Sequence, residues 1–364
     1  MTKSDDKRVP VLRFKGFTDE WEQRKLGEVS KITAGGDVDK EKLLLHGKFP
    51  VIANALTNDG IVGYYNDTYR ITAPAVTVTG RGEIGKAKAR KNNFTPVVRL
   101  LAVESKHNVD FLAEAINRSK VVFESTGVPQ LTVPKLSNYK ILFPNSIDEE
   151  IEVGNFLSRF DSLITLQQRK LKLLKLMKNI VSYNLVVSHK LASNDEIKWK
   201  AVYLKDIARI YQPTTITKKD LLPKGIPVFG ANDYIGFYNK YNHETDQVTI
   251  CARGASAGHP NYVKGPVWIT GNSMVINVDE TYINKKFLYT LLTFTDLKRF
   301  VTGGAQPQIT RENLNSLKIL LPSIKAQNNL SAIIENLSIN IRKVQLSINS
   351  AKRLKQFLLQ NMFI

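Results

Sequence analysis

Cysteine and acidic residues are both scarce in this sequence of 364 residues. Cys251 is the single cysteine, so an internal disulfide and a zinc site built from several cysteines are both excluded. The five histidines are scattered without the spacing of metal ligands, so we expect no metal site. No apolar run reaches the roughly 18 residues of a membrane span, and the charged N-terminus lacks the apolar stretch of a signal peptide. We therefore expect a cytoplasmic protein without membrane segments.

Signatures of catalysis are also missing. The sequence contains no Gly-x-x-x-x-Gly-Lys-Ser/Thr loop, no Gly-x-Ser-x-Gly elbow and no Asp/Asn-Pro-Pro-Tyr/Phe tetrad of amino-methyltransferases. Residues 80–85 fit a Gly-x-Gly-x-x-Gly pattern, but the basic residues after them lack the apolar helix face that a dinucleotide site requires. The acidic residues 148–150 begin a predicted helix, where they favour its dipole. We expect a non-catalytic chain with no cofactor of its own.

Positive charge, in contrast, is in excess. The chain has 52 Lys and Arg residues against 33 Asp and Glu residues, which gives a formal net charge of +19. Such a surplus raises the local concentration of polyanions and speeds encounter with them. The charge therefore predicts nucleic acid or an anionic membrane surface as the partner.

The sequence is also repeated. Residues 125–144 and 303–322 carry the same pattern, and matching residues in them are 178 positions apart. The pairs with this separation are Trp21 with Trp199, Leu26 with Leu204, Pro129 with Pro307, Gln130 with Gln308, Thr132 with Thr310, Leu136 with Leu314 and Pro144 with Pro322. A repeat of this length is a whole domain plus a connector, so the chain is predicted to contain two tandem copies of one unit.

Each copy begins with a turn-rich region of short β-like runs. Residues 75–79 correspond to residues 248–251, and residues 97–103 correspond to residues 274–278. The separation between copies falls to 172 or 173 in the middle of the domain. Insertions and deletions therefore lie in loops between fixed elements, which is where a variable recognition surface is built.

Each copy ends with a long helical tract. Apolar residues recur there in steps of three and four, which predicts two antiparallel coiled-coil helices of about 40 residues, roughly 60 Å long. The two helices must run in opposite directions. The first leads from the first domain to the second, and the second leaves the second domain with the same local geometry and so returns toward the first. The alternative explanation is that the apolar stripe along each helix packs against a neighbouring domain instead of against the other helix. The predicted helix-pair interface contains Leu157, Phe160, Ile164, Leu171, Leu174, Val181, Leu337, Ile341, Val344, Ile348 and Leu358.

These patterns together predict an α+β fold with an approximate two-fold axis. Each copy is expected to contain a region of mixed β-sheet and helices, from Trp21 to Pro144 and from Trp199 to Pro322, which is followed by one long helical tract. Two basic domains held at a fixed separation suit a split site on duplex DNA. Two units that bind the same face of B-DNA must be about one helical turn, ~34–36 Å, or a multiple of it apart.

Basic and polar loops in each copy supply the candidate DNA contacts. Lys and Arg neutralise phosphates, and Arg also reads guanine in the major groove. The candidates in the first copy are Arg81, Lys86, Lys88, Arg90, Lys91 and Gln130. The candidates in the second copy are Arg253, Ser256, His259, Tyr262, Lys264 and Gln308. Solvated hairpins, and structural turns for the two glutamines, remain the alternatives.

The chain resembles a known family in several of these features. The Trp-x-x-x-x-Leu openings at Trp21 and Trp199, the Thr-Gly-x-x-Gln loop at residues 126–130, the Leu-Pro-type endings and the repeated helices are similar to those of specificity subunits of type I restriction-modification enzymes. The resemblance covers essentially the whole chain. The basic loops of the two copies differ, so individual base contacts cannot be transferred from the family.

This resemblance implies two target-recognition domains, at residues 17–145 and 195–323, with a central helical spacer at residues 146–194 and a C-terminal one at residues 324–364. It also implies a division of labour. Each recognition domain would read one half of a bipartite DNA sequence, and the helices would dock two modification subunits that use S-adenosylmethionine to methylate adenine. Restriction subunits would add ATP- and Mg-dependent translocation and cleavage. The sequence leaves two alternatives open, a non-restriction architectural DNA-binding scaffold and an enzyme that acts alone.

Overall fold

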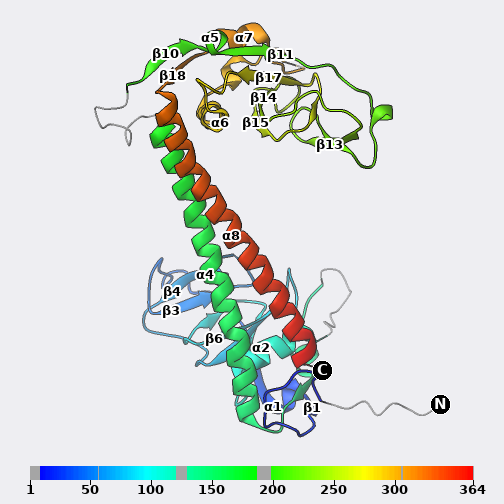
Figure 1. The fold of residues 1–364 in the computed structure, drawn as a ribbon. Helices are drawn as coiled ribbons and strands as arrows, with labels where there is room; N and C mark the ends of the chain where they lie inside the picture. The colour runs from blue at the N-terminus through cyan, green and yellow to red at the C-terminus, as the bar shows by residue number, and fades with distance from the viewer. Residues whose placement is uncertain (1–8, 56, 120–128, 187–197, 305, 364) are drawn as a thin grey trace, which may run out of the picture. The chain divides into compact units, whose positions relative to one another are not determined.

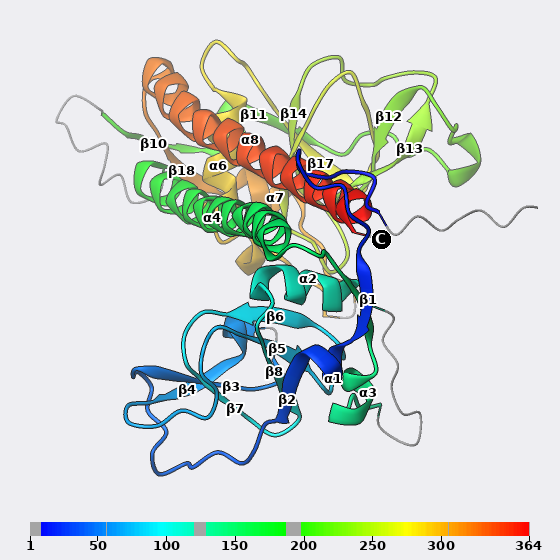
Figure 2. The same ribbon diagram turned by 90° about the horizontal axis from the view of Figure 1, so that it is seen from below.

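The computed structural model describes residues 9–55, 57–119, 129–186, 198–304 and 306–363. The chain divides into two compact units. Unit 1 comprises residues 1–168 and 346–364, and unit 2 comprises residues 169–345 (Figures 1 and 2). Both units mix helices with sheets that are mostly antiparallel and contain one parallel strand pair in each unit, which confirms the predicted α+β class.

Unit 1 contains three small sheets. A four-stranded sheet has the order β2-β8-β5-β6, a three-stranded sheet has the order β4-β3-β7, and β1 pairs with β9. The strands are β1 (Glu22–Lys25), β2 (Ser30–Ala34), β3 (Phe49–Ile52), β4 (Ile61–Tyr65), β5 (Ala75–Thr79), β6 (Ala87–Arg90), β7 (Thr95–Pro96), β8 (Leu100–Ser105) and β9 (Lys140–Phe143). The short helices are α1 (Leu26–Val29), η1 (Thr57–Gly60), α2 (Val109–Arg118) and α3 (Val133–Ser137).

Unit 2 repeats this topology. Its sheets have the orders β11-β17-β14-β15 and β13-β12-β16, and β10 pairs with β18. The strands are β10 (Lys200–Tyr203), β11 (Ala208–Tyr211), β12 (Ile226–Phe229), β13 (Tyr234–Tyr238), β14 (Gln247–Cys251), β15 (Pro260–Val263), β16 (Trp268–Ile269), β17 (Ser273–Val278) and β18 (Lys318–Leu321). The short helices are α5 (Leu204–Ile207), η3 (Lys218–Asp220), α6 (Lys285–Phe294), η4 (Lys298–Phe300) and α7 (Arg311–Asn315). The tandem duplication predicted from the sequence is therefore confirmed.

The core of each unit forms where a helix covers its four-stranded sheet. Every residue of β5 and of β14 is buried, because both faces of these central strands are covered. Helix α2 packs on β5 and β6, and α6 packs on β14 and β15 (Figure 2). The two helices start in the same way. The side chain of Asn108 accepts a hydrogen bond from Phe111 N, and that of Asn284 accepts one from Phe287 N.

A long helix follows the sheets of each copy, α4 (Ile147–Val186) after the first and α8 (Ile324–Met362) after the second. Within each unit the parts of α4 and α8 that belong to it lie side by side in opposite directions (Figures 1 and 2). In unit 1, Lys355 Nζ lies 2.7 Å from Asp161 Oδ1. In unit 2, Val181 packs against a core that includes Leu330 and Ile334. The predicted antiparallel pairing is thus present in both units.

Burial follows the predicted stripe along both helices. Leu157, Val344 and Ile348 are buried, and the other predicted interface residues are half-buried. Large apolar side chains outside the stripe remain exposed, such as Leu173 at 65% and Leu346 at 60%. The stripe residues therefore face the protein interior, while the opposite surfaces of α4 and α8 retain apolar side chains that nothing described here covers.

The end of α8 completes the core of unit 1. The ring of Phe363 lies 5.2 Å from that of Phe111 and 5.9 Å from that of Trp21, and only 6% of Phe363 is exposed. The N-terminal segment is held here too, because Leu12 N donates to Asn361 O and Arg13 pairs with the buried Glu149. Residues from the two ends of the sequence therefore share one core.

Candidate nucleic-acid interface

The turn between β5 and β6 contains the glycine-rich segment. Gly82 and Gly85 have φ angles of +76° and +79°, in the left-handed region that favours glycine. Strand β6 follows directly and pairs with β5 from Val78 and Ala87 onward. A helix is therefore absent at the place where a dinucleotide-binding motif requires one. The glycines serve a hairpin turn, and this turn presents Arg81 to solvent.

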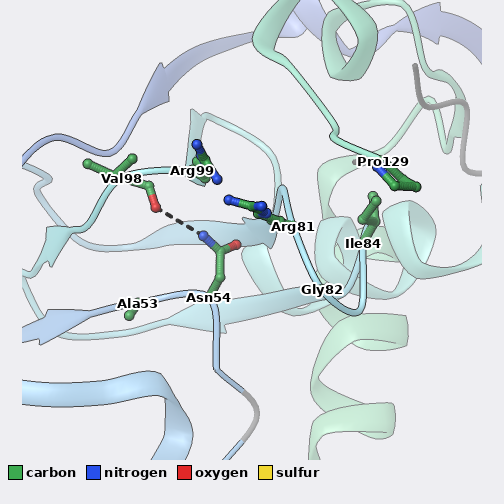
Figure 3. A pocket seen from close by; sticks show the side chains of 8 residues that line it. All are labelled: Ala53, Asn54, Arg81, Gly82, Ile84, Val98, Arg99 and Pro129. Carbon is green, nitrogen blue, oxygen red and sulfur yellow. Dashed lines mark hydrogen bonds between the residues drawn. The ribbon is translucent and has the colours of Figure 1, made fainter. Parts of the chain in front are cut away.

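A pocket of about 770 Å³ opens beside this turn in unit 1. Its polar lining comes from Asn54, Arg81 and Arg99, which lie on three separate loops (Figure 3). Asn54 connects the loops through two hydrogen bonds. Its Nδ2 donates to Val98 O at 3.1 Å, and its Oδ1 accepts from Gly80 N at 2.9 Å. The amide side chain of Asn54 thus fixes the positions from which the two arginines project.

The charge in this pocket is uncompensated. No acidic residue lines it, and neither Arg81 nor Arg99 forms an ion pair with any residue that the structure describes. Arg99 has a φ of +72°, which is unfavourable for a side chain of this kind. Two guanidinium groups that share one pocket offer many hydrogen-bond donors and no acceptor. The pocket is therefore suited to an acceptor-rich or anionic partner.

Most other basic candidates on this sheet have acidic partners. Both Lys88 and Arg90 contact the carboxylate of Asp59, and Lys91 Nζ lies 2.8 Å from Asp110 Oδ2. Burial lowers the pKa of Arg90 despite the attraction of Asp59. These charges are partly neutralised within the domain. Lys86 is exposed without an ion pair in the described part of unit 1, and Gln130 is half-buried next to Pro129, which lines the pocket. All of them stay predictions as DNA contacts.

The corresponding loops of unit 2 form a second cluster. Arg253 and Gln308 form an isolated β-bridge, and Gly254 N donates to Pro307 O at 2.9 Å. Arg253 and Gln308 line a pocket of about 430 Å³ together with Arg311 and other residues. The fold therefore joins two of the predicted residues that are 55 positions apart in the sequence, from 253 to 308.

The remaining candidates in unit 2 separate into two groups. Ser256, His259 and Lys264 are exposed. Tyr262, however, is bound within the domain, because its hydroxyl donates to Asp246 Oδ2 at 2.9 Å and its ring packs against Tyr289. Burial, and then the nearby carboxylate of Asp246, raise the pKa of Tyr262. The first group can reach a ligand without rearrangement, whereas Tyr262 would first give up its partner.

Equivalent backbone hydrogen bonds assemble the loop clusters of the two copies. In unit 1, Gly80 N donates to Arg99 O at 3.1 Å, and Leu131 N donates to Gly80 O at 2.8 Å. In unit 2, Ala252 N donates to Asn272 O at 2.9 Å, and Ile309 N donates to Ala252 O at 3.0 Å. Arg99 and Asn272 therefore occupy the same place in the two folds. The basic segment identified in the sequence extends to Arg99, whereas Asn54 and Asn272 were not singled out. The mid-domain separation of 172 or 173 could have identified Arg99 and Asn272 as a pair.

The described ranges do not assemble a cluster of metal-binding side chains. They contain no group of three or more His, Cys, Asp or Glu residues that could hold a metal ion. The thiol of Cys251 is buried, and burial raises its pKa, so it is a poor nucleophile. A search of the described helices finds none that is long and apolar enough to cross a membrane.

The fold and the loop clusters define a class of protein built from two tandem copies of one recognition domain, each linked to long paired helices. The sequence matches the family described as the type I restriction modification DNA specificity domain twice, over residues 18–176 and 196–350. The chain belongs to this family and carries its domain in two tandem copies. Specificity subunits recognise DNA and are not catalytic, and the alternative of an architectural scaffold is not favoured.

Similar proteins extend over most of the chain. A putative type I specificity subunit of Mycoplasma pneumoniae is 25% identical over 86% of this chain and 88% of its own length. The MjaVIII specificity subunit of Methanocaldococcus jannaschii is 24% identical over 92% and 91%, respectively. The crystal structure of an S subunit from M. genitalium has a TM-score of 0.73 at 18% identity and covers 98% of this chain and 99% of its own. This last likeness shows the shared fold.

Proposed function

We propose that this specificity subunit directs a type I restriction-modification complex to a bipartite DNA sequence, with each recognition domain reading one half. The observation that carries the proposal is the pair of loop clusters. They are assembled by equivalent hydrogen bonds, yet they present different side chains, with Arg99 in unit 1 and Asn272 in unit 2. Domains with the same frame and different contact groups suit two half-sites of different sequence.

The long helices would set the unread spacer and dock the modification subunits. Exposed apolar side chains support the docking role, because a contiguous apolar patch on a soluble protein usually marks an interaction site. Four such residues lie within two turns on the part of α4 that belongs to unit 2. They are Leu173, Leu176, Met177 and Ile180, each about half exposed or more. Because the chain contains two units of the same topology, we expect it to bind two modification subunits.

The chemistry of the complex would reside on the partners. The modification subunits would bind S-adenosylmethionine and methylate adenine, and the restriction subunits would use ATP and Mg for translocation and cleavage. The complex would act in the cytoplasm as a site-specific DNA methyltransferase and ATP-dependent endonuclease. The present chain would contribute recognition of the target DNA sequence. Purified chain incubated with DNA and S-adenosylmethionine should transfer no methyl group until a modification subunit is added.

A domain exchange tests the division of labour. Residues 17–145 are replaced by the corresponding domain of another family member, and methylated positions are sequenced in cells that also express the modification subunit. We expect one half of the methylated sequence to change and the other half to persist. A matched chimera that exchanges residues 195–323 should change the opposite half. If either chimera alters both halves, the two domains do not read separately.

A further inference from the structure

The pocket at Asn54, Arg81 and Arg99 holds two arginines that form no ion pair with any side chain the structure describes. We propose that Arg99 and Asn272, which occupy equivalent places, each select one base pair, with Arg99 reading guanine in the first half-site and Asn272 reading adenine in the second. This inference rests on the proposed function, because it presumes that the two loop clusters face DNA.

The first argument is geometric. Each residue is fixed through its backbone, because the carbonyl oxygens of Arg99 and Asn272 accept hydrogen bonds from Gly80 N and Ala252 N. The side chains are thereby left to project from a defined position. Arg99 keeps this position even though its φ of +72° is unfavourable for a residue with a side chain, which indicates that the surrounding hydrogen bonds dictate the conformation.

The second argument is chemical. Arg donates two parallel hydrogen bonds to O6 and N7 of guanine, whereas Asn pairs with N6 and N7 of adenine. A guanidinium group that has no acid nearby remains available for such a contact. Arg99 fulfils this condition in the described part of unit 1, and Asn272 is exposed in unit 2. Arg90 is the contrasting case, because its guanidinium already contacts Asp59.

The third argument concerns support. Asn54 donates to Val98 O, next to Arg99, and accepts from Gly80 N, next to Arg81, so one amide positions both arginine-bearing loops (Figure 3). Unit 2 has Ala231 at the equivalent position, and there Ser273 Oγ donates to the carbonyl oxygens of Gly230 and Ala231 instead. Asn54 is therefore a positioning residue for the Arg99 contact, and its removal should weaken the base preference without changing which base is preferred.

Reciprocal substitutions test the assignment. Arg99→Asn and Asn272→Arg are each assembled with the modification subunit and selected against DNA libraries in which one half-site is randomised. We expect Arg99→Asn to change one base pair of the first half-site from G·C to A·T, and Asn272→Arg to make the opposite change in the second. The preference at that base pair should shift about 5- to 150-fold, which is the range of a single bidentate base contact. The other half-site should keep its sequence in each case.

A matched control separates base reading from general charge. Lys86→Asn removes one positive charge from the neighbouring hairpin and should lower affinity for all sequences alike, with a smaller salt dependence. If Arg99→Asn behaves in the same way, Arg99 contacts phosphate and the assignment is wrong. It is equally wrong if both reciprocal variants retain the wild-type half-sites.

The remaining outcomes are also decisive. Asn tolerates the left-handed region better than Arg does, so Arg99→Asn should fold, and unchanged thermal unfolding checks this. If that variant nevertheless unfolds, Asn272→Arg decides alone, because its backbone is not in that region. If the wild-type complex selects no split sequence, the proposed function itself is wrong. If the wild-type complex selects a split sequence and both variants select the same one, only this inference is wrong.

Discussion

At the scale of single residues, the environment of a charge decides what it can do. Arg81 and Lys88 are both predicted to contact DNA from one short basic segment, yet Lys88 contacts Asp59 and Arg81 does not pair with any described acid. Asp59 is 29 positions from Lys88 in the sequence, and only the fold brings the two together. Sequence composition therefore shows where basic residues are concentrated, but it cannot show which of their charges remain available to a ligand.

Buried His243 gives unit 2 a predicted dependence on pH. Burial, and then the nearby Lys285, lower the pKa of His243, and its ring nitrogens lie 2.7 Å from Tyr211 Oη and Asn242 Oδ1. His243 binds a proton more readily in the unfolded state than in the folded state. The contribution of neutral His243 to stability is therefore complete above the ordinary pKa of about 6.5 and is lost as the pH falls below that value. We expect His243→Gln to cost about 1–2 kcal/mol at pH 8 through the altered hydrogen bonds.

The measurement is thermal unfolding of the full chain between pH 8 and pH 5. The unfolding temperature of unit 2 should fall more steeply with acid in the wild type than in His243→Gln. A conservative surface variant, His259→Gln, serves as the control, because His259 is exposed. Identical pH profiles for wild type and His243→Gln would show that His243 is not the group responsible.

At the scale of elements, local pattern and long-range packing contributed differently. Apolar periodicity predicted both long helices, which begin at Ile147 and Ile324. The β-like run at residues 97–103 was less well defined, because β8 begins only at Leu100 after a turn that contains Arg99. Lys355 interrupts the apolar stripe of α8 but reaches Asp161 on α4 and Glu114 on α2. Burial lowers the pKa of Lys355, but hydrogen bonds to these two carboxylates outweigh it and leave the pKa raised.

The aromatic contact at the end of α8 predicts a local loss of stability on truncation. Phe363→Ala removes a ring that packs on Phe111 and Trp21, and large-to-small changes of this kind cost about 3–5 kcal/mol. We expect unit 1 to unfold at lower denaturant concentration while unit 2 is unchanged. Phe357→Ala is the matched control, because Phe357 lies on α8 close to Phe363 in the sequence and 52% of it is exposed. Equal effects of the two substitutions in the isolated chain would contradict this account of the core.

At the scale of the whole molecule, the internal repeat was the most informative signal. It predicted two units of one topology, and the strand orders of the two units agree element by element. The surface proposed to read bases could not be predicted to the same degree. Asn54 and Arg99 acquire their proposed roles from hydrogen bonds between loops that are 26 and 44 positions apart, and no local pattern encodes those contacts.

Helix length should determine the unread spacer of the DNA site. Four residues inserted in both α4 and α8 at paired positions add ~6 Å of helix. The spacer between half-sites should then lengthen by no more than about two base pairs, given ~3.4 Å per base pair, while both half-site sequences persist. Methylation sequencing reports both properties. A spacer of unchanged length would show that the helices do not set the distance.

The shared core of unit 1 also bears on how the protein is made. Phe363 is translated 252 positions after Phe111, to which it packs, so the nascent first domain lacks part of its interior while the second is synthesised. Unit 2 is a continuous stretch of residues 169–345 and has no such gap. Domains usually fold in the order of their synthesis. Here all core residues of unit 2 are synthesised before the core of unit 1 is complete, because unit 1 also requires the last residues of α8 and Phe363.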